Sequence, residues 1–373
     1  MLIGNFFKDL NLKYKNHFFS GLSFSSVSCK ENNIFFAIKG TKKNGEKFIN
    51  DAIKNGATTI VSKGKFQGFK KKVLYINAEN VRKTLSKISF LIYDKKPKNL
   101  IAVTGTNGKS SVADFFYQIL KFNKISSGTI GTLGILSKKY NKKTQLTSMD
   151  PLSLHKNLKI LAKKNVNHVI LEASSHGLDQ RRLDGLNIKV GIFTNLSHDH
   201  LDYHKSLKSY LNSKIYLFKK LVNKNSRIIT DEDNREFNII NKISKRRKIK
   251  KITIGTKTGD IKILRNEYKE HEQIIKLLIK SEIITIKVPL IGYFQIKNLL
   301  MAILAASFFG LDKKKIFKQI HRIKPVSGRL ECVAKLKNNS KVIVDFAHTP
   351  DALEQSLIEL QKQFKNQILL VFG

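Results

Sequence analysis

The stretch IAVTGTNGKSSVADFF, residues 101–116, restricts the fold of this chain more than any other feature. An apolar run ends in a Gly-Lys-Ser turn, and apolar residues then recur at the spacing of one helix face. This order predicts a strand, a tight loop and a helix, with the backbone N–H groups of the loop pointing at an anion. Lys109 would bring positive charge to the terminal phosphates of a nucleotide, and Ser110 would offer Mg²⁺ a hydroxyl.

The predicted phosphate loop departs from the general pattern at one position. That pattern has glycine where this chain has Val103, so we interpret the loop as a shortened form. The residues that we expect to line it are Gly105, Thr106, Asn107, Gly108, Lys109, Ser110 and Ser111.

Short apolar runs alternate with helical patterns after residue 99. Continuous apolar strands separated by helices predict an α/β fold with a parallel sheet that is covered on both faces. The runs are LIAVTG, HVILEASS, VGIFTNLS, SRIITD and KKITIG. A buried helix is expected over the apolar residues 299–311.

Two proline-containing stretches predict domain boundaries. YDKKPKNL follows a small α/β unit with strands at 33–38 and 57–62, and RIKPVSGRLE follows the central sheet. We therefore expect domains at 1–96, 97–326 and 327–373. The last would contain one βαβ unit, with strands in KVIVDFAHTP and QILLVFG on either side of the helix DALEQSLIELQKQF.

The chain is strongly basic, with 69 Lys and Arg against 28 Asp and Glu and a formal net charge of +41. The lysines are spread along the whole chain and mix with Asn and Ile, as coding bias in an AT-rich genome would produce, so we expect no specific nucleic-acid partner. No signal peptide and no apolar run long enough for a bilayer occurs, which favours a cytoplasmic protein without a membrane partner. The two cysteines predict no disulfide framework.

Acidic residues and histidines follow two of the predicted strands. Glu172 ends the run HVILE, and His198, Asp199 and His200 follow the run VGIFTNLS. Because the carboxyl ends of parallel strands share one edge, we expect Glu172 to be a metal-binding carboxylate beside the phosphate loop. A hard-cation site with one imidazole is the simpler interpretation of the histidines, and their spacing leaves zinc open.

Five motifs together resemble the Mur ligases of peptidoglycan synthesis, and among them the members that form the tripeptide: VTGTNGKSS, LEASSHGLDQRRL, TNLSHDHLDYH, SGRLE and VDFAHTPDAL. The resemblance implies three domains: a UDP-sugar-binding domain, a central P-loop ATPase and a Rossmann-like C-terminal domain, incomplete here. It also implies ATP-dependent, ADP-forming amide ligation through an acyl phosphate in cell-wall biogenesis. The substrates would be UDP-N-acetylmuramoyl dipeptide, ATP and a diamino acid, and the enzyme a monomer.

The resemblance also assigns roles to individual residues. The family's catalytic residues match Lys109, Glu172, His200 and Lys214, of which Lys214 would be carbamylated. Its Mg²⁺ ligands match Ser110, Glu172 and the carbamate of Lys214, and a ligand of its second Mg²⁺ matches His200. Further ATP-binding residues match Asn298, Arg329, Asp345 and His348. The residues matching its UDP-substrate contacts are Ser26, Thr147, Ser148, Ser174, Gln180 and Arg182.

The sequence departs from the family in three substrate-binding motifs and after residue 373. The family's Asp-Ser-Arg appears as Ser25-Ser26-Val27, Leu146 stands where asparagine is frequent, and Gln295 replaces an asparagine. The Asp-Asn-Pro-Arg motif that selects the incoming amino acid does not occur. We favour meso-diaminopimelate over L-lysine from TNLSHDHLDYH and DFAHTPDALEQSL. One alternative stays open, an inactive truncated remnant that only binds nucleotide.

Overall fold

The structure is a computed structural model that describes every residue of the chain except 41–42, 270–271, 339, 365–366 and 373. By its contacts the chain divides into two compact units. Unit 1 contains Met1–Lys96, Met149–Ile160 and Gln180–Leu186, and unit 2 contains Pro97–Ser148, Leu161–Asp179 and Asn187–Gly373. The three-domain boundaries expected from the sequence stay a prediction. Within the described part of the chain, no helix is both long and apolar enough to cross a membrane.

Unit 1 contains a five-stranded sheet in the order β1-β2-β3-β5-β4. All neighbours pair in parallel except β4 and β5. The strands predicted at 33–38 and 57–62 are confirmed as β2 and β3. The elements are β1 Gly21–Ser23, β2 Asn33–Phe36, β3 Ala57–Ser62, β4 Gly68–Lys70, β5 Val73–Asn77, α1 Ile49–Lys54, α2 Val81–Ile92 and the short 3-10 helices Ile3–Asn5, Leu12–Tyr14, Ser26–Ser28 and Gly45–Phe48.

Unit 2 contains a ten-stranded sheet in the order β15-β14-β13-β12-β11-β10-β6-β9-β7-β8. The seven strands from β13 to β7 in this order pair in parallel, as predicted, and β14, β15 and β8 add antiparallel edges. The strands are β6 Asn99–Thr104, β7 Ser127–Gly131, β8 Gly134–Ser137, β9 His168–Glu172, β10 Ile188–Phe193, β11 Val222–Asp231, β12 Lys250–Gly255, β13 Ile261–Tyr268, β14 Gln273–Ile279 and β15 Glu282–Val288.

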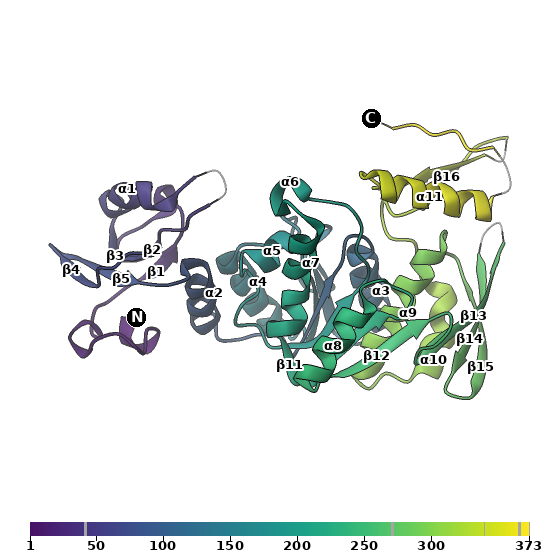
Figure 1. Cartoon of the computed structure of the whole chain (residues 1–373), viewed down its shortest axis with the longest axis horizontal. Helices are drawn as coiled ribbons and strands as arrows, with labels where there is room; N and C mark the ends of the chain where they lie inside the picture. The colour runs from purple at the N-terminus through teal and green to yellow at the C-terminus, as the bar shows by residue number, and fades with distance from the viewer. Residues whose placement is uncertain (41–42, 270–271, 339, 365–366, 373) are drawn as a thin grey trace. The chain divides into compact units, whose positions relative to one another are not determined.

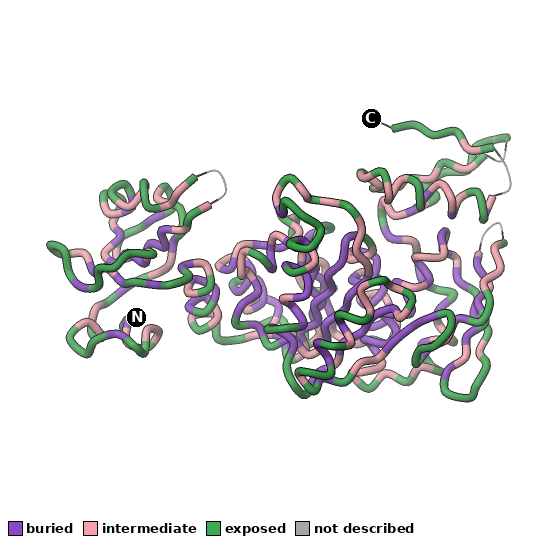
Figure 2. Tube along the Cα trace, viewed as in Figure 1, coloured by how far each residue is buried: buried purple, intermediate pink, exposed green. Residues whose placement is uncertain are grey.

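Helices cover both faces of this sheet. On one face α3, Lys109–Phe122, packs beside α9, Tyr293–Phe308 (Figure 1). The buried helix expected over 299–311 is confirmed as part of α9, which begins earlier and ends at Phe308. The other face carries the π-helix Leu217–Leu221 and α8, Phe237–Arg247. Figure 2 shows the central strands buried along most of their length. The remaining helices are α4 Pro151–Lys163, α5 Ser175–Asp179, α6 Leu201–His204, α7 Leu207–Tyr216, α10 Lys313–Gln319, the 3-10 helix Ile320–Arg322 and α11 Pro350–Gln363.

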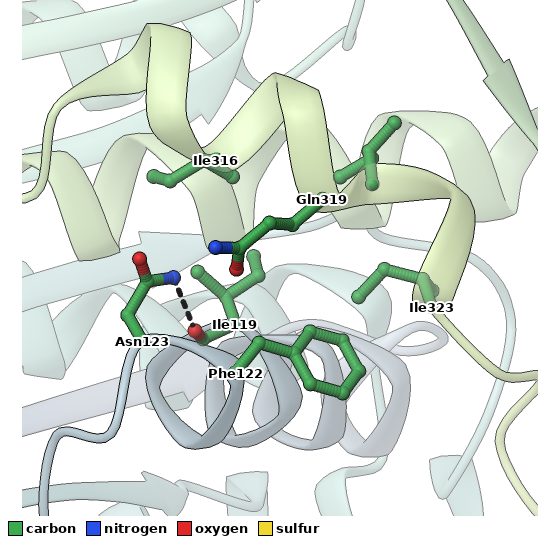
Figure 3. A pocket seen from close by; sticks show the side chains of 7 residues that line it. Ile119, Phe122, Asn123, Ile316, Gln319 and Ile323 are labelled. Atoms are coloured by element: carbon green, nitrogen blue, oxygen red, sulfur yellow. Dashed lines mark hydrogen bonds between the residues drawn. The ribbon is translucent and has the colours of Figure 1, made fainter.

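A small apolar crevice separates the C-terminal half of α3 from α10 and the following 3-10 helix (Figure 3). The crevice begins at Ile119, ten residues after Lys109, which is about 15 Å further along the helix. It therefore lies away from the end of α3 that carries the predicted phosphate loop. Its lining residues are Ile119, Phe122, Asn123, Ile316, Gln319, Ile320 and Ile323.

The segment after residue 327 differs from the expected βαβ unit. Strands β16, Glu331–Lys335, and β17, Lys341–Val344, form an antiparallel hairpin, and α11 follows. The strand expected in QILLVFG is wrong for the described residues 367–372, which form no regular structure. The physical reason is the lack of a pairing strand, because β16 and β17 make a sheet of two strands and Leu369 stays 90% exposed.

Candidate active site

The predicted strand, loop and helix are confirmed as β6, residues 105–108 and α3. Gly108 caps the helix with a positive φ of 86°, which disfavours any residue with a side chain. The Asn298 side chain of α9 also packs against it, because a Cβ on Gly108 would lie 2.4 Å from Asn298 Oδ1. The backbone of the loop therefore lies directly against a side chain of α9.

The end of β10 holds the loop in place. Thr194 Oγ1 donates a hydrogen bond of 2.6 Å to the Asn107 carbonyl, and the Asn107 N–H donates to Asn195 Oδ1 at 2.8 Å. The Thr106 N–H donates to the Asn195 carbonyl at 3.0 Å. Because β6 and β10 pair in parallel, their carboxyl ends meet at one edge of the sheet. These bonds fix the loop without a ligand.

Two lysine amines, those of half-buried Lys109 and buried Lys214, converge on one backbone carbonyl. Lys109 Nζ donates to Gly105 O at 2.9 Å and to Thr106 O at 2.6 Å, and Lys214 Nζ donates to the same Gly105 O at 2.7 Å. Burial lowers the pKa of Lys109, and burial together with the charge of Lys109 lowers the pKa of Lys214 well below its usual range. No carboxylate in the described residues forms an ion pair with either amine. This arrangement favours an added anion.

Glu172 lies at the carboxyl end of β9 and is buried beside the loop. Ser110 Oγ donates to Glu172 Oε2 at 2.9 Å, so the two predicted metal-binding side chains are in contact. Hydroxyl and carboxylate oxygens are ligands that Mg²⁺ accepts, and phosphate oxygens commonly complete its octahedron. In the described part of the chain, no three His, Cys, Asp or Glu side chains are grouped to hold a metal ion. The donor set therefore fits Mg²⁺ with a nucleotide better than the zinc site that the histidines left open.

His200 follows β10 at the start of α6 and contacts an aromatic cluster. Its ring lies 4.8 Å from the ring of His176 and 6.1 Å from that of Tyr210. The Tyr210 hydroxyl in turn donates to Thr106 Oγ1 at 3.3 Å, and Lys214 Nζ lies 4.1 Å from the centre of the Tyr210 ring. Burial lowers the pKa of His200, which favours the neutral imidazole that a metal requires.

Two of the four predicted ATP-binding residues outside the loop, Asn298 and Arg329, are connected through Gln295. Asn298 Nδ2 donates to Gln295 Oε1 at 3.2 Å, and Gln295 Nε2 donates to the Arg329 carbonyl at 3.3 Å. Burial lowers the pKa of the Arg329 guanidinium, and the charge of Asp345 opposes this shift. Among them His348 is exposed.

Three of the residues predicted to contact the UDP-substrate lie next to Glu172. Ser148 Oγ donates to the Glu172 carbonyl at 2.8 Å, and Ser174 Oγ donates to Ser148 Oγ at 3.0 Å. Thr147 Oγ1 lies 3.1 Å from Thr132 Oγ1, which itself donates to Glu172 Oε2. Hydroxyl groups therefore connect the predicted metal-binding carboxylate to the predicted substrate residues.

The other three predicted substrate residues belong to unit 1. Arg182 donates to Gln180 Oε1 at 2.7 Å, and Arg82 donates to the same oxygen at 3.3 Å. Ser26 lies in a 3-10 helix, where its carbonyl accepts a hydrogen bond of 3.0 Å from Asn55. The structure thus brings Gln180 and Arg182 together within this unit.

Four residues that contact the site were not predicted from the sequence: Thr132, Thr194, Asn195 and Tyr210. Two signals could have found them. Thr132 follows β7, and Thr194 and Asn195 follow β10, and the carboxyl ends of these strands share an edge with that of β6. Tyr210 precedes Lys214 by one helical turn, so the two side chains share a helix face.

Two family models match this sequence. Residues 103–306 match the model described as "Mur ligase middle domain", and residues 328–373 match "Mur ligase, glutamate ligase domain". The first match contains the phosphate loop, Glu172, His200, Lys214 and Asn298.

Several similar proteins carry the name UDP-N-acetylmuramoyl-L-alanyl-D-glutamate--2,6-diaminopimelate ligase. The protein of that name from Rickettsia prowazekii (strain Madrid E) is 37% identical over 371 residues, which is 98% of this chain and 76% of the relative. The one from Rhizobium meliloti (strain 1021) is 35% identical over 376 residues, which is 100% of this chain and 77% of the relative. A solved structure of that title superposes with a TM-score of 0.84 at 27% identity, covering 98% of this chain and 75% of the other. MurF from Thermotoga maritima in complex with ADP shares the fold, with a TM-score of 0.62 at 20% identity, covering 91% and 74%.

Proposed function

Because the chain belongs to the Mur ligase family, we propose that it joins meso-diaminopimelate to UDP-N-acetylmuramoyl-L-alanyl-D-glutamate with the hydrolysis of ATP to ADP and phosphate. The printed names of the relatives support the diamino acid, and L-lysine is the less favoured alternative. One observation carries the proposal for the site. Lys109 Nζ lies 2.9 Å from Gly105 O, next to a helix N-terminus and the Ser110–Glu172 pair, and the phosphates of a nucleotide would supply the negative charge that this ammonium group lacks.

The proposed reaction overcomes the low reactivity of a carboxylate. The side-chain carboxylate of D-glutamate attacks the γ-phosphorus of ATP, and the bond between that phosphorus and the bridging oxygen of ADP breaks. The amine of the diamino acid then attacks the acyl phosphate, loses a proton and displaces inorganic phosphate. The site catalyses both steps by positioning and by neutralising charge, for which Lys109 and the N–H groups at the start of α3 are suited.

Mg²⁺ is part of this proposal. Ser110, Glu172 and a carbamate on Lys214 would be protein ligands, and His200 would be a ligand of a second Mg²⁺. The bound cation would withdraw charge from the transferred phosphoryl group. Carbamylation requires a neutral amine: the lone pair of Lys214 Nζ attacks the carbon of CO₂, an N–C bond forms and a proton leaves. The lowered pKa of Lys214 supports this step, because burial favours the neutral amine.

The remaining predicted contacts complete the proposed substrate sites. Asn298, Arg329, Asp345 and His348 would contact ATP around the loop. Thr147, Ser148 and Ser174 would contact the muramoyl peptide beside Glu172, and the unit 1 residues Ser26, Gln180 and Arg182 its remaining parts. We place this ATP-consuming reaction in the cytoplasm and expect a monomer, with no nucleic-acid or membrane partner.

The test is a product assay on the protein with UDP-N-acetylmuramoyl-L-alanyl-D-glutamate, Mg²⁺ and ATP. Each reaction receives meso-diaminopimelate, L-lysine or no amino acid, and mass spectrometry measures the mass of the UDP-linked product. We expect a mass increase equal to one diaminopimelate residue and an equal amount of ADP. Product with L-lysine alone would contradict the proposed amino acid. Mg²⁺-dependent binding of ADP without any product would support the alternative of an inactive nucleotide-binding remnant.

A further inference from the structure

The turn between β7 and β8 wraps closely around the Glu172 carboxylate. β7 pairs in parallel with β9, with Ile130 opposite Leu171, so the turn after β7 reaches the end of β9 where Glu172 lies. The last residue of β7, Gly131, precedes the turn and has no room for a side chain, because a Cβ there would lie 2.0 Å from Glu172 Oε1. The backbone of this turn is therefore in direct contact with the carboxylate.

Thr132 donates two hydrogen bonds to that carboxylate. Its backbone N–H donates to Glu172 Oε1 at 2.9 Å, and its hydroxyl donates to Glu172 Oε2 at 3.1 Å. With the bond from Ser110, three donors occupy a group that offers about four lone-pair positions. Donors on both oxygens fix the rotation of the carboxylate plane, as partners of metal ligands commonly do.

The Thr132 hydroxyl also connects Glu172 to the predicted substrate side. Its oxygen lies 3.1 Å from Thr147 Oγ1. A hydroxyl has one proton, so while Thr132 donates to Glu172 the bond between the threonines must be donated by Thr147. Thr147 is then left with lone pairs only, and a ligand donor such as a peptide N–H would bind to it. Such a donor would polarise this series of hydrogen bonds and strengthen the bond from Thr132 to Glu172.

We propose that Thr132 is a positioning residue, which orients Glu172 toward the metal–nucleotide complex and transmits to it the binding of the peptide substrate at Thr147. The inference rests on the proposed function, since it takes Glu172 as a metal ligand and Thr147 as a substrate contact. The proposal couples the peptide substrate and the metal–nucleotide complex through the Thr132 hydroxyl. Each ligand must then change the affinity of the other by the same factor.

The experiment is isothermal titration calorimetry of ADP with Mg²⁺, or with EDTA, in the presence and absence of UDP-N-acetylmuramoyl-L-alanyl-D-glutamate. The wild type is compared with Thr132→Val, which removes only the hydroxyl, and with Thr132→Ser, which restores it. Thr144→Val is the matched control, because the Thr144 hydroxyl donates to the Gly131 carbonyl at 3.1 Å in the same region and has no bond to Glu172. ADP binding in EDTA verifies that each variant retains a folded loop.

We expect Thr132→Val to weaken Mg–ADP binding about tenfold, as the loss of one hydrogen bond to a charged group does, and to leave ADP binding in EDTA unchanged. The dipeptide substrate should tighten Mg–ADP binding to the wild type and to Thr132→Ser and should not do so for Thr132→Val. Equal Mg–ADP affinities of Thr132→Val and Thr144→Val would overturn the orienting role. A substrate that binds without changing Mg–ADP affinity in the wild type would overturn the coupling.

The same experiment separates this inference from the proposed function. If the dipeptide substrate binds to none of the four proteins, the proposed substrate and the coupling are both wrong. The comparison of Mg–ADP affinities still decides whether Thr132 orients Glu172, because that measurement requires no second substrate.

Discussion

Replacing Lys109 with methionine removes the ammonium group from the phosphate loop and keeps a side chain of similar length. Lys109 Nζ lies 2.9 Å from Gly105 O, so phosphates bound over the loop would approach it to about 4 Å. Two unit charges at that distance interact with about 4 kcal/mol at an effective dielectric constant of 20. At about 1.4 kcal/mol per factor of ten, we expect kcat/KM for ATP to fall about a thousandfold. Steady-state ADP release with the dipeptide and diaminopimelate measures this change.

The matched control for that experiment is Lys121→Met. Lys121 lies in the last turn of the same helix and is exposed, about 18 Å along the axis from Lys109. Its loss should change kcat/KM by less than about twofold, because exposed charges contribute little. If Lys109→Met keeps more than a tenth of the wild-type value, the assignment of the loop to the ATP phosphates is refuted.

Three further predictions concern the loop, the second lysine and the pH dependence of stability. Gly108→Ala should weaken Mg–ADP binding about tenfold in calorimetry, because its Cβ would lie 2.4 Å from Asn298 Oδ1. Gly310→Ala is the control: Gly310 also has a positive φ, but a Cβ there would have no neighbouring atom within 4 Å, so this variant should bind Mg–ADP normally. Removing CO₂ and bicarbonate should lower wild-type activity and adding bicarbonate should restore it, whereas Lys214→Met should lose about a hundredfold and stay insensitive to bicarbonate. Burial lowers the pKa of His155 to about 3, so the unfolded chain binds this proton more readily and stability falls as the pH drops from 6.5 toward 3. At pH 5 this effect lowers the free energy of unfolding of the wild type by about 2 kcal/mol. Urea unfolding at pH 7.5 and pH 5 should therefore show a decrease in that free energy that is about 2 kcal/mol smaller for His155→Leu than for the wild type.

The sequence contained enough information for the central sheet because its strands are continuous apolar runs. SRIITD and KKITIG became β11 and β12, with side chains packed on both faces of the sheet. The antiparallel strands β13 to β15 were missed, since their burial alternates and their charged residues interrupt each run. The strand expected in QILLVFG was wrong because apolar character alone does not supply a pairing partner.

The candidate site was predictable to the extent that local motifs encode it. The loop with Lys109 and Ser110 is contiguous in sequence, and Glu172 ends a strand next to it in the sheet. The convergence of Lys214 on Gly105 O joins residues 109 positions apart, which no local pattern reports. The same holds for Thr132, whose importance arises from the close approach of two strand ends.

The central claim is that this site transfers the γ-phosphate of ATP to a carboxylate, and ¹⁸O transfer tests it most directly. The dipeptide substrate is labelled with ¹⁸O in the side-chain carboxylate of its D-glutamate and incubated with the chain, ATP, Mg²⁺ and meso-diaminopimelate. The account predicts one ¹⁸O atom in each released phosphate, because the oxygen that attacks phosphorus leaves with it. ADP and amide product accompanied by unlabelled phosphate would contradict the account.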